Sequence, residues 1–466
     1  MGRLFGTDGV RGVANEDLTP ELAFRLARAG ARVLLAGRRG RGGDGDGATA
    51  QRPFVLIGRD TRVSGDMLEA AMTAGFTSAG VDVWSLGIIP TPGVAYLTRT
   101  LPAAAGVMIS ASHNPVADNG IKFFSHDGFK LPDEVEDRIE EALSGNDGGD
   151  RPTGAAVGRR IAREDLVERY EEFLVSTIEQ GGGGQGSFAG LRIVLDCACG
   201  AASRVAPRVF AALGATVGTI NAELDGLRIN VGCGSTHPEG LRKAVVREKA
   251  DLGLAFDGDA DRLIAVDENG EIVDGDRIMA VCGLDLLERG RLTGGRIAVT
   301  VYSNLGLLEA MRLRGADAVI TQNGDRYVLE AMQEQGLALG GEQSGHIIFL
   351  EHNTTGDGIL TGVQLVAAIR QRGQTLGEAS RVMRRFPQVL MNVRVREGGR
   401  AAWQSSEPIG EAISRAQDLL GDRGRLLVRA SGTEPLIRVM GEGPEEVVVQ
   451  QAVESVAGVI RREFGE

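Results

Sequence analysis

The sequence predicts an α/β protein with three mixed or parallel α/β domains and a smaller C-terminal α+β domain, arranged around a central cleft. Two observations predict this class. Short apolar runs alternate with segments of helical periodicity through most of the chain, which is typical of layered α/β domains. Beyond about residue 385, several strand-like runs follow one another and precede a single amphipathic helix. We therefore expect domains at residues 1–164, 165–266, 267–384 and 385–466.

Composition narrows the class of protein. A chain of 466 residues is too long for one ordinary core, and its hydrophobic content of 42% suits a globular protein. No apolar run reaches the roughly 18–20 residues of a membrane span, and the first residues lack a signal-peptide core, so a cytoplasmic protein is expected. The net charge of −12 disfavours binding to nucleic acid. Four cysteines argue against a disulfide scaffold, and Cys197 and Cys199 are expected to be a buried structural pair.

The expected helices and strands follow from the positions of proline and glycine and from the spacing of apolar residues. A helix is expected to begin at Pro20, because proline favours the first helical position. Residues 37–50 have almost no apolar content and are expected to form a flexible surface insertion. The expected strands are residues 54–57, 106–109, 191–195, 252–256, 296–301, 318–320, 389–395, 425–428 and 436–440. Further helices are expected at residues 165–178, near 203–213 and between 301 and 318. A final helix is expected with Val448, Ala452, Val456 and Val459 on one face.

Two motifs indicate chemistry. Ser112 follows an apolar run and is expected on an exposed turn, and Asp257, Asp259 and Asp261 occupy alternate positions after another apolar run. A serine hydroxyl can carry a phosphoryl group, and carboxylate oxygens hold Mg²⁺, often with a phosphate as a further ligand. The pair predicts a phosphoserine enzyme with one Mg²⁺ on the three aspartates and Ser112.

Other interpretations of these motifs stay open. Ser112 alone is compatible with an ordinary turn, and the aspartates with a solvated loop, although three such carboxylates repel one another without a cation. A phosphatase with Asp257 as an aspartyl nucleophile also fits an apolar strand followed by Asp-x-Asp. A non-catalytic sensor of sugar phosphates is the second rival.

Six segments together resemble the α-D-phosphohexomutase family over nearly the whole chain. They are residues 4–12 (Leu-Phe-Gly-Thr-Asp-Gly-Val-Arg-Gly), 110–115 (Ser-Ala-Ser-His-Asn-Pro), 119–122 (Asn-Gly-Ile-Lys), 257–262 (Asp-Gly-Asp-Ala-Asp-Arg), 341–346 (Gly-Glu-Gln-Ser-Gly-His) and 429–435 (Arg-Ala-Ser-Gly-Thr-Glu-Pro). Each segment alone is moderately specific, and six in the family's order are very specific. The insertion at 37–50, Cys199 in place of an expected asparagine, and the Gln322-Asn323 lead-in depart from the family pattern without touching a motif that carries chemistry.

The resemblance implies roles for individual residues. It places Lys122 and Arg11 around the phosphoserine and assigns Glu342 and Ser344 to sugar hydroxyls. His346 is a candidate general acid or base. His113 is expected to shape the loop or contact phosphate, and its side chain need not converge with that of Ser112. The expected cradle for the non-reacting phosphate consists of Arg429, Ser431, Gly432, Thr433 and Arg438.

The resemblance also implies an activity. Residues 230–238 and 341–346 favour the branch that interconverts glucosamine 6-phosphate and glucosamine 1-phosphate through a 1,6-bisphosphate. That branch feeds UDP-N-acetylglucosamine and cell-wall precursor synthesis, and glucosamine or glucose 1,6-bisphosphate is the expected activator. Phosphoglucomutase or phosphomannomutase activity stays the alternative. The expected partners are a hexosamine phosphate and a second copy of the chain in a homodimer, without nucleic acid or membrane.

Overall fold

The structure is a computed structural model that describes residues 3–6, 8–35, 52–145, 151–179, 187–396, 398–431 and 434–465. The insertion predicted at 37–50 and the cradle residues Gly432 and Thr433 lie outside these residues. The chain divides into two compact units. One unit contains Met1–Val301 with Ala318–Arg381, and the other contains Tyr302–Asp317 with Val382–Glu466.

The first sheet has six strands in the order β1-β5-β4-β2-β3-β6. Its strands are β1 (Val10–Val13), β2 (Phe54–Arg59), β3 (Asp82–Ile88), β4 (Ala105–Ile109), β5 (Asp118–Ser125) and β6 (Arg160–Ala162). The accompanying helices are α1 (Pro20–Leu35), α2 (Ser64–Ser78), α3 (Thr91–Thr100) and α4 (Asp133–Ser144), with a short 3₁₀ turn at Gly154–Ala156. β2, β3, β4 and β6 are parallel, whereas β5 is antiparallel to both β1 and β4.

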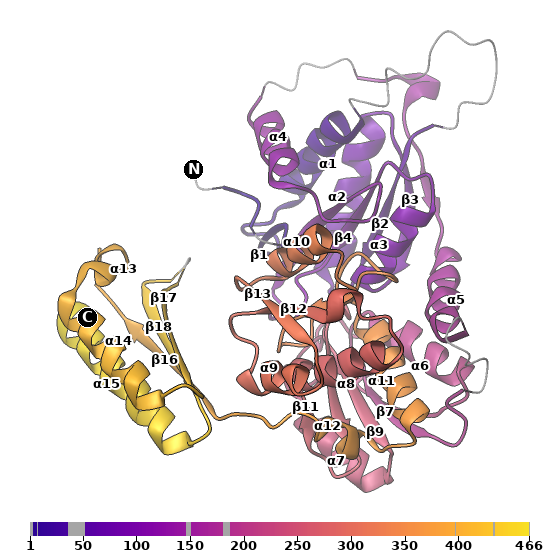
Figure 1. The fold of residues 1–466 in the computed structure, drawn as a ribbon. Coiled ribbons are helices and arrows are strands. Elements are labelled where there is room, and N and C mark those ends of the chain that lie inside the picture. Colours follow the sequence, from indigo (N-terminus) through magenta and orange to yellow (C-terminus); the bar gives the residue numbers. More distant parts are fainter. Residues whose placement is uncertain are drawn as a thin grey trace. The chain divides into compact units, whose positions relative to one another are not determined.

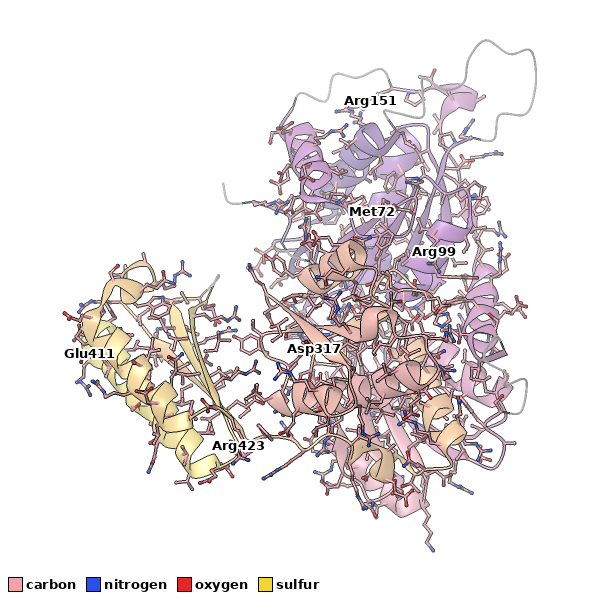
Figure 2. The ribbon with its side chains drawn as sticks, in the orientation of Figure 1. Met72, Arg99, Arg151, Asp317, Glu411 and Arg423 are labelled. Carbon is pink, nitrogen blue, oxygen red and sulfur yellow. The ribbon has the colours of Figure 1, made fainter. Side chains whose placement is uncertain are left out.

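Helices cover both faces of this sheet, which explains why its central strands β2 and β4 are apolar without alternation. Val55 and Ile57 of β2 belong to the core beneath α1 and α2, which includes Met72 (Figure 2). Phe54 and Leu56 face the opposite core with α3. Figure 1 shows α1 and α2 side by side on the sheet.

The second and third sheets also belong to the larger unit, apart from Asp317 at the start of β13. The second, in the order β11-β10-β9-β7-β8, consists of β7 (Arg192–Asp196), β8 (Thr216–Ile220), β9 (Leu252–Phe256), β10 (Leu263–Asp267) and β11 (Ile272–Val273), with α5 (Leu166–Glu179), α6 (Ala202–Ala212) and α7 (Glu239–Glu248). The third, in the order β13-β12-β14-β15, consists of β12 (Arg296–Thr300), β13 (Asp317–Thr321), β14 (Leu339–Gly341) and β15 (Ile347–Phe349). Its helices are α8 (Gly275–Glu288), α10 (Asp325–Gln335), α11 (Gly358–Arg372) and α12 (Leu376–Ser380), with a 3₁₀ turn at Thr293–Gly295.

The smaller unit contains a three-stranded antiparallel sheet in the order β16-β18-β17. Its elements are α9 (Leu305–Arg312), β16 (Gln388–Arg394), α13 (Gly399–Ala402), a 3₁₀ turn at Trp403–Ser405, α14 (Glu407–Leu420), β17 (Arg425–Ala430), β18 (Leu436–Glu442) and α15 (Glu446–Phe464). α14 and α15 lie next to each other and share one hydrophobic core with the sheet (Figure 1). On α15, Val449 and Val453 are fully buried. Of the four residues predicted on one face, Ala452, Val456 and Val459 are in the core and Val448 is only partly buried.

The predicted fold class of three α/β domains and a smaller α+β domain is confirmed. The four domain boundaries given above remain predictions. Among the described residues, no helix combines the length and apolar character needed to cross a membrane. Cys197 and Cys199 are buried free thiols, as expected of a structural pair.

Candidate active site

The loop between β4 and β5 carries Ser112 in a left-handed backbone conformation, with φ of 53°. The Ser112 amide donates to Oγ of Ser110 at 2.9 Å, and Nδ2 of Asn230 donates to the Ser112 carbonyl at 2.8 Å. The prediction of an exposed turn is wrong, because Ser112 is only 1% exposed. Neighbouring loops from the second α/β sheet cover the serine, which periodicity within one segment does not reveal.

Arg62, a residue to which sequence analysis assigned no role, donates hydrogen bonds to the main chain of this loop from a buried position. Its guanidinium is fully buried and its Nε donates to Asp60 at 3.0 Å. Its two terminal nitrogens donate to four main-chain oxygens of the serine loop, those of Ser112, Asn114, Pro115 and Asp118. All five N–H donors of the guanidinium therefore have acceptors. One side chain thus contacts the main chain at four positions of this loop.

The three aspartates lie beside the serine. Oγ of Ser112 donates to Oδ2 of Asp257 at 2.6 Å. Asp257, Asp259 and Asp261 are buried, and each offers one carboxylate oxygen within 4.8 Å of the others. Among the described residues, none donates a hydrogen bond to Oδ1 of Asp259 or to Oδ1 of Asp261, although both atoms are buried.

This cluster fits a divalent cation. Burial, followed by repulsion from Asp261 and Asp259, raises the pKa of Asp257 well above its usual range. A cation bound between the carboxylates would remove that repulsion and would supply a partner for the buried oxygens. Three hard oxygen donors beside a serine that can carry phosphate form a set suited to Mg²⁺.

Lys122 and Arg11, the two basic residues predicted near the serine, both form ion pairs with Asp8. Nζ of Lys122 is buried and lies 2.9 Å from Oδ2 of Asp259 and 3.0 Å from Oδ2 of Asp8. Arg11 also pairs with Asp8, and Oδ1 of Asn114 lies 3.5 Å from its guanidinium. Burial alone would lower the pKa of Lys122, but the carboxylates of Asp259 and Asp8 outweigh it, so the pKa is raised. Lys122 is therefore a charged ammonium group.

Asp8 and Thr91 are site residues that sequence analysis missed. Asp8 lies in the segment 4–12 already noted for its resemblance, which was the available indication. Oγ1 of Thr91 donates to Oδ2 of Asp259 at 2.5 Å. Thr91 follows β3, far from the aspartates in sequence, and no local pattern marks it.

The predicted sugar-reading residues come together on the turn between β14 and β15. Oγ of Ser344 donates to Glu342 at 3.2 Å. The Leu263 amide, directly after the metal loop, donates to the Gly345 carbonyl at 3.0 Å. Gly345 has φ of +92°, and a Cβ there would lie 2.1 Å from the Leu263 oxygen, so only glycine permits this approach. The predicted sugar-binding turn, residues 342–346 (the sugar loop), is thus joined directly to the loop of the three aspartates, residues 257–262 (the metal loop).

His346 ends this turn and is buried. Its Nδ1 lies 3.6 Å from Asp261, its Nε2 lies 3.6 Å from Asp325, and the Gly356 amide donates to Nε2 at 3.1 Å. Burial alone would lower the pKa of His346, but the carboxylates of Asp261 and Asp325 raise it above its ordinary value. The structure therefore places this residue beside a predicted metal ligand.

His113 and Arg262 flank the same centre. Nδ1 of His113 lies 3.3 Å from Oγ of Ser112, so the two side chains do converge. Burial, followed by the positive charge of Arg262, lowers the pKa of His113 to about 4. His113 is therefore a neutral imidazole near neutral pH. The Arg262 amide donates to Asp257 at 3.1 Å, and its guanidinium lies 3.8 Å from Asp261.

In the smaller unit, Arg429 and Arg438 face each other across the β17–β18 ladder. The guanidinium of Arg429 lies 4.9 Å from the centre of the Tyr302 ring and donates to its hydroxyl. Arg438 donates to Glu434 at 3.1 Å, and Ser431 is buried at the end of β17. Like charges directly opposite each other are unfavourable, and Glu434 offsets the charge of Arg438. Gly432 and Thr433 lie outside the described residues.

Comparison with known proteins agrees with this organisation. Four family models match in order, each described as a phosphoglucomutase/phosphomannomutase domain: α/β/α domain I at residues 2–148, α/β/α domain II at 168–270, α/β/α domain III at 274–386 and the C-terminal domain at 390–459. The chain belongs to the phosphoglucomutase/phosphomannomutase family, the α-D-phosphohexomutases. It is an enzyme of the isomerase class, and the resemblance drawn from the six segments is confirmed.

Within the family, the similarity is to phosphoglucosamine mutases. The chain is 53% identical to the phosphoglucosamine mutase of Heliobacterium modesticaldum, over 99% of this chain and 100% of that protein. It is 52% identical to that of Caldanaerobacter subterraneus subsp. tengcongensis, over 100% of both chains.

Solved structures share the fold. A phosphoglucomutase/phosphomannomutase family protein from Burkholderia thailandensis is 22% identical with a TM-score of 0.80, covering 100% of this chain and 99% of that one. An N-acetylphosphoglucosamine mutase from Aspergillus fumigatus, in complex with GlcNAc-6P and magnesium, is 18% identical with a TM-score of 0.67, covering 98% and 95%.

Proposed function

We propose that this protein interconverts glucosamine 6-phosphate and glucosamine 1-phosphate as a cytoplasmic phosphoserine enzyme. The observation that carries the proposal is the 2.6 Å contact between Oγ of Ser112 and Asp257 in a buried cluster of three carboxylates. A phosphoryl carrier and a cation site thus share one buried location. Identities of 53% and 52% to phosphoglucosamine mutases, over nearly the whole of each chain, favour the hexosamine phosphates as substrates.

The reaction begins with a phosphate on Ser112. A free hydroxyl of the hexosamine monophosphate attacks phosphorus, and the P–O bond to Ser112 breaks, which leaves the serine oxygen as the leaving group. The product is a 1,6-bisphosphate. After the bisphosphate reorients in the site, the Ser112 oxygen attacks its other phosphate. The P–O bond to the sugar breaks, and the isomeric hexosamine monophosphate leaves. Glucosamine or glucose 1,6-bisphosphate would act as activator by phosphorylating Ser112 in enzyme that has lost its phosphate.

Charge neutralisation is the main task of the surrounding side chains. Asp257, Asp259 and Asp261 would hold Mg²⁺ with the phosphoserine as a further ligand, and the bound cation would neutralise charge on the transferring group. Lys122 supplies a buried positive charge next to the same carboxylates. Arg11, which pairs with Asp8, supplies a second positive charge.

Substrate recognition is divided between two loops. Glu342 and Ser344 lie within hydrogen-bonding distance of each other and would bind adjacent sugar hydroxyls. His346 would act as the general acid or base for the sugar hydroxyl. Arg429, Ser431, Gly432, Thr433 and Arg438 would hold the phosphate that is not reacting. The facing pair of Arg429 and Arg438 supports an anion site on this sheet.

Turnover on three substrates tests the proposal. We expect a much higher kcat/KM with glucosamine 6-phosphate than with glucose or mannose 6-phosphate. Equal or greater activity on glucose or mannose phosphates would assign the chain to another branch of the family. Acid-stable, hydroxylamine-resistant phosphoenzyme is expected of phosphoserine, whereas an aspartyl phosphate on Asp257 would be labile to hydroxylamine. Sedimentation velocity tests the predicted homodimer.

A further inference from the structure

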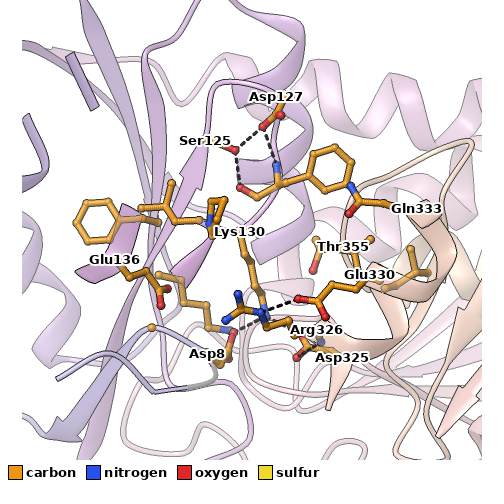
Figure 3. Close-up of a pocket in the computed structure, with 18 of the residues that line it drawn as sticks. Asp8, Ser125, Asp127, Lys130, Glu136, Asp325, Arg326, Glu330, Gln333 and Thr355 are labelled. Atoms are coloured by element: carbon orange, nitrogen blue, oxygen red, sulfur yellow. Dashed lines mark hydrogen bonds and ion pairs between the residues drawn. The ribbon is translucent and has the colours of Figure 1, made fainter. Parts of the chain in front are cut away.

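A cavity of about 260 Å³ adjoins the active site within the larger unit (Figure 3). Its wall combines residues of the first α/β sheet with residues of α10 and the sugar loop, including Lys122 and His346. Lys130 enters this cavity from the segment after β5, where it pairs with Phe124 in an isolated β-bridge. The segment is anchored across the larger unit, because Oγ1 of Thr354 donates to the Gly128 carbonyl at 2.6 Å.

Lys130 forms two short ion pairs that cross between these elements. Its Nζ lies 2.5 Å from Oδ1 of Asp8 and 2.5 Å from Oδ2 of Asp325, the first residue of α10. All three side chains are less than one-fifth exposed. Figure 3 shows Asp8, Lys130 and Asp325 converging at one end of the cavity. The ammonium group of Lys130 therefore attracts both carboxylates and offsets the repulsion between them.

Each of these carboxylates also contacts a residue of the proposed reaction. The second oxygen of Asp8 lies 3.0 Å from Nζ of Lys122 and also pairs with Arg11. Oδ2 of Asp325 lies 3.6 Å from Nε2 of His346.

The contacts close into a ring. His346 lies 3.6 Å from Asp261, and Asp261 lies 3.8 Å from Lys122. Six side chains thus form a ring in which basic and acidic groups alternate. They come from the strands, helices and loops of all three α/β layers. They are Lys122, Asp8, Lys130, Asp325, His346 and Asp261. Lys130 lies opposite Asp261 in this ring, three contacts away in either direction.

We propose that Lys130 is a positioning residue for the reaction. Its ammonium group fixes Asp8 and Asp325 relative to each other. Asp8 in turn orients Lys122, and Asp325 orients His346. The inference rests on the proposed function and adds a role for a residue outside the phosphoserine, metal, sugar and phosphate-binding loops.

Charge and geometry explain why lysine suits this position. Burial alone would lower the pKa of Lys130, but the carboxylates of Asp325 and Asp8 outweigh it and raise the pKa. The ammonium group is therefore charged throughout the working pH range. Without it, the two carboxylates would separate or one would take up a proton, and the contact of Asp8 with Lys122 or of Asp325 with His346 would shift.

The test compares Lys130→Met with Lys130→Arg by steady-state kinetics on glucosamine 6-phosphate. For Lys130→Met we expect kcat to fall roughly 10–100-fold, because small displacements of catalytic groups are costly. KM should change by less than about threefold, since the sugar and phosphate-binding loops keep their residues. Lys130→Arg retains the charge and should recover most of the lost kcat. Unchanged kcat in Lys130→Met would overturn the inference.

Arg326→Met is the matched control. Arg326 lines the same cavity, and its guanidinium joins α10 to Asp133 of α4 at 2.5 Å. The residue contacts the ring through its main-chain amide, which donates to Asp325 at 2.9 Å and is kept in Arg326→Met. Its kcat should stay within about twofold of the wild type, because partly exposed ion pairs contribute little. A fall in kcat equal to that of Lys130→Met would show that any ion pair between these elements has the same effect, and would reject a specific role for Lys130.

The double variant Lys130→Met/Asp325→Asn separates positioning from stability. It removes the charge of one of the two carboxylates that lose Lys130, so its melting temperature should rise above that of Lys130→Met. Its kcat should stay low, because His346 lacks one of its two carboxylate partners. Recovery of kcat together with melting temperature would mean that Lys130 only stabilises the fold. Wild-type enzyme inactive on glucosamine phosphates would refute the proposed function instead, and the same variants would then be compared on the hexose phosphate that the wild type converts.

Discussion

The guanidinium of Arg62 donates to the main-chain oxygen of Ser112 at 3.1 Å, from a position with no solvent exposure. The residue that would carry the phosphoryl group is therefore held by its backbone, while its hydroxyl is left for Asp257 and the chemistry. The same guanidinium binds three further carbonyls of the loop, so the left-handed conformation of Ser112 is stabilised by groups that do not react.

Replacing Arg62 with Met should destabilise the fold and the loop together. The buried carboxylate of Asp60 would lose its partner, and breaking a buried ion pair typically costs about 3–5 kcal/mol. We expect a matching loss of unfolding free energy in urea denaturation and a large loss of kcat. Arg62→Lys keeps the charge but cannot reach four carbonyls, so it should recover stability more than activity. Full activity in Arg62→Met would show that the loop does not need this support.

Ser112→Ala should abolish turnover while the fold is retained. Alanine keeps the Cβ and removes only the hydroxyl that contacts Asp257, so the change in stability should not exceed about 1.5 kcal/mol. Phosphopeptide mapping of the active wild-type enzyme should place phosphate on Ser112. Ser344→Ala is a useful comparison, because it removes a hydroxyl of the sugar loop and should raise KM without preventing phosphorylation of Ser112. Phosphate found on another residue of active enzyme would contradict the assignment.

Asp259→Asn should lower activity by orders of magnitude and weaken binding of Mg²⁺. Asparagine keeps an oxygen for Thr91 and Lys122 but removes one anionic ligand from the cluster. Calorimetric titration with Mg²⁺ measures the binding separately from turnover. Asp251→Asn is the control, because that exposed carboxylate precedes β9 and accepts only from the Arg192 amide among the described residues. Full wild-type activity in excess chelator would refute the metal requirement.

Arg429→Ala should raise KM roughly tenfold or more, since a charge-assisted hydrogen bond to phosphate is worth about 1.5–3 kcal/mol. Metal binding and phosphorylation of Ser112 should be spared, and more bisphosphate intermediate should escape. Tyr302→Phe is the control, because it keeps the ring beneath the guanidinium and removes only the hydroxyl. A variant that binds substrate normally but loses its metal would show that the cradle assignment is wrong.

Shortening residues 37–50 to a few residues should leave activity and melting temperature nearly unchanged. The segment lies outside the described residues, and the prediction rests on its composition, which offers too little apolar surface to offset ordering entropy. Thermal denaturation and turnover of the shortened protein provide the test. Loss of folding would show that the segment is structural.

The sequence by itself determined the succession of elements and the chemistry of the main loops. Apolar runs such as Phe54–Arg59 and Leu252–Phe256 became strands because both faces of their sheets are covered, and such burial leaves a local pattern. Ser112 and the three aspartates could be singled out because each lies in a short segment of the sequence that follows an apolar run. The assignment of Glu342 and Ser344 to sugar hydroxyls came from the resemblance to the family and stays a prediction, and the structure shows that the two side chains contact each other.

Only the tertiary structure decided which distant residues complete the site. Burial of Ser112, the donation from Thr91 to Asp259, and the clasp of Arg62 depend on loops from different strands meeting at one place. Lys130 and Asp325 are separated by 195 positions, and nothing near either residue indicates its partner. Electrostatic pairing acts over a few ångströms in space whatever the separation along the chain, so the ring that connects Lys122 with His346 exists only in the folded protein.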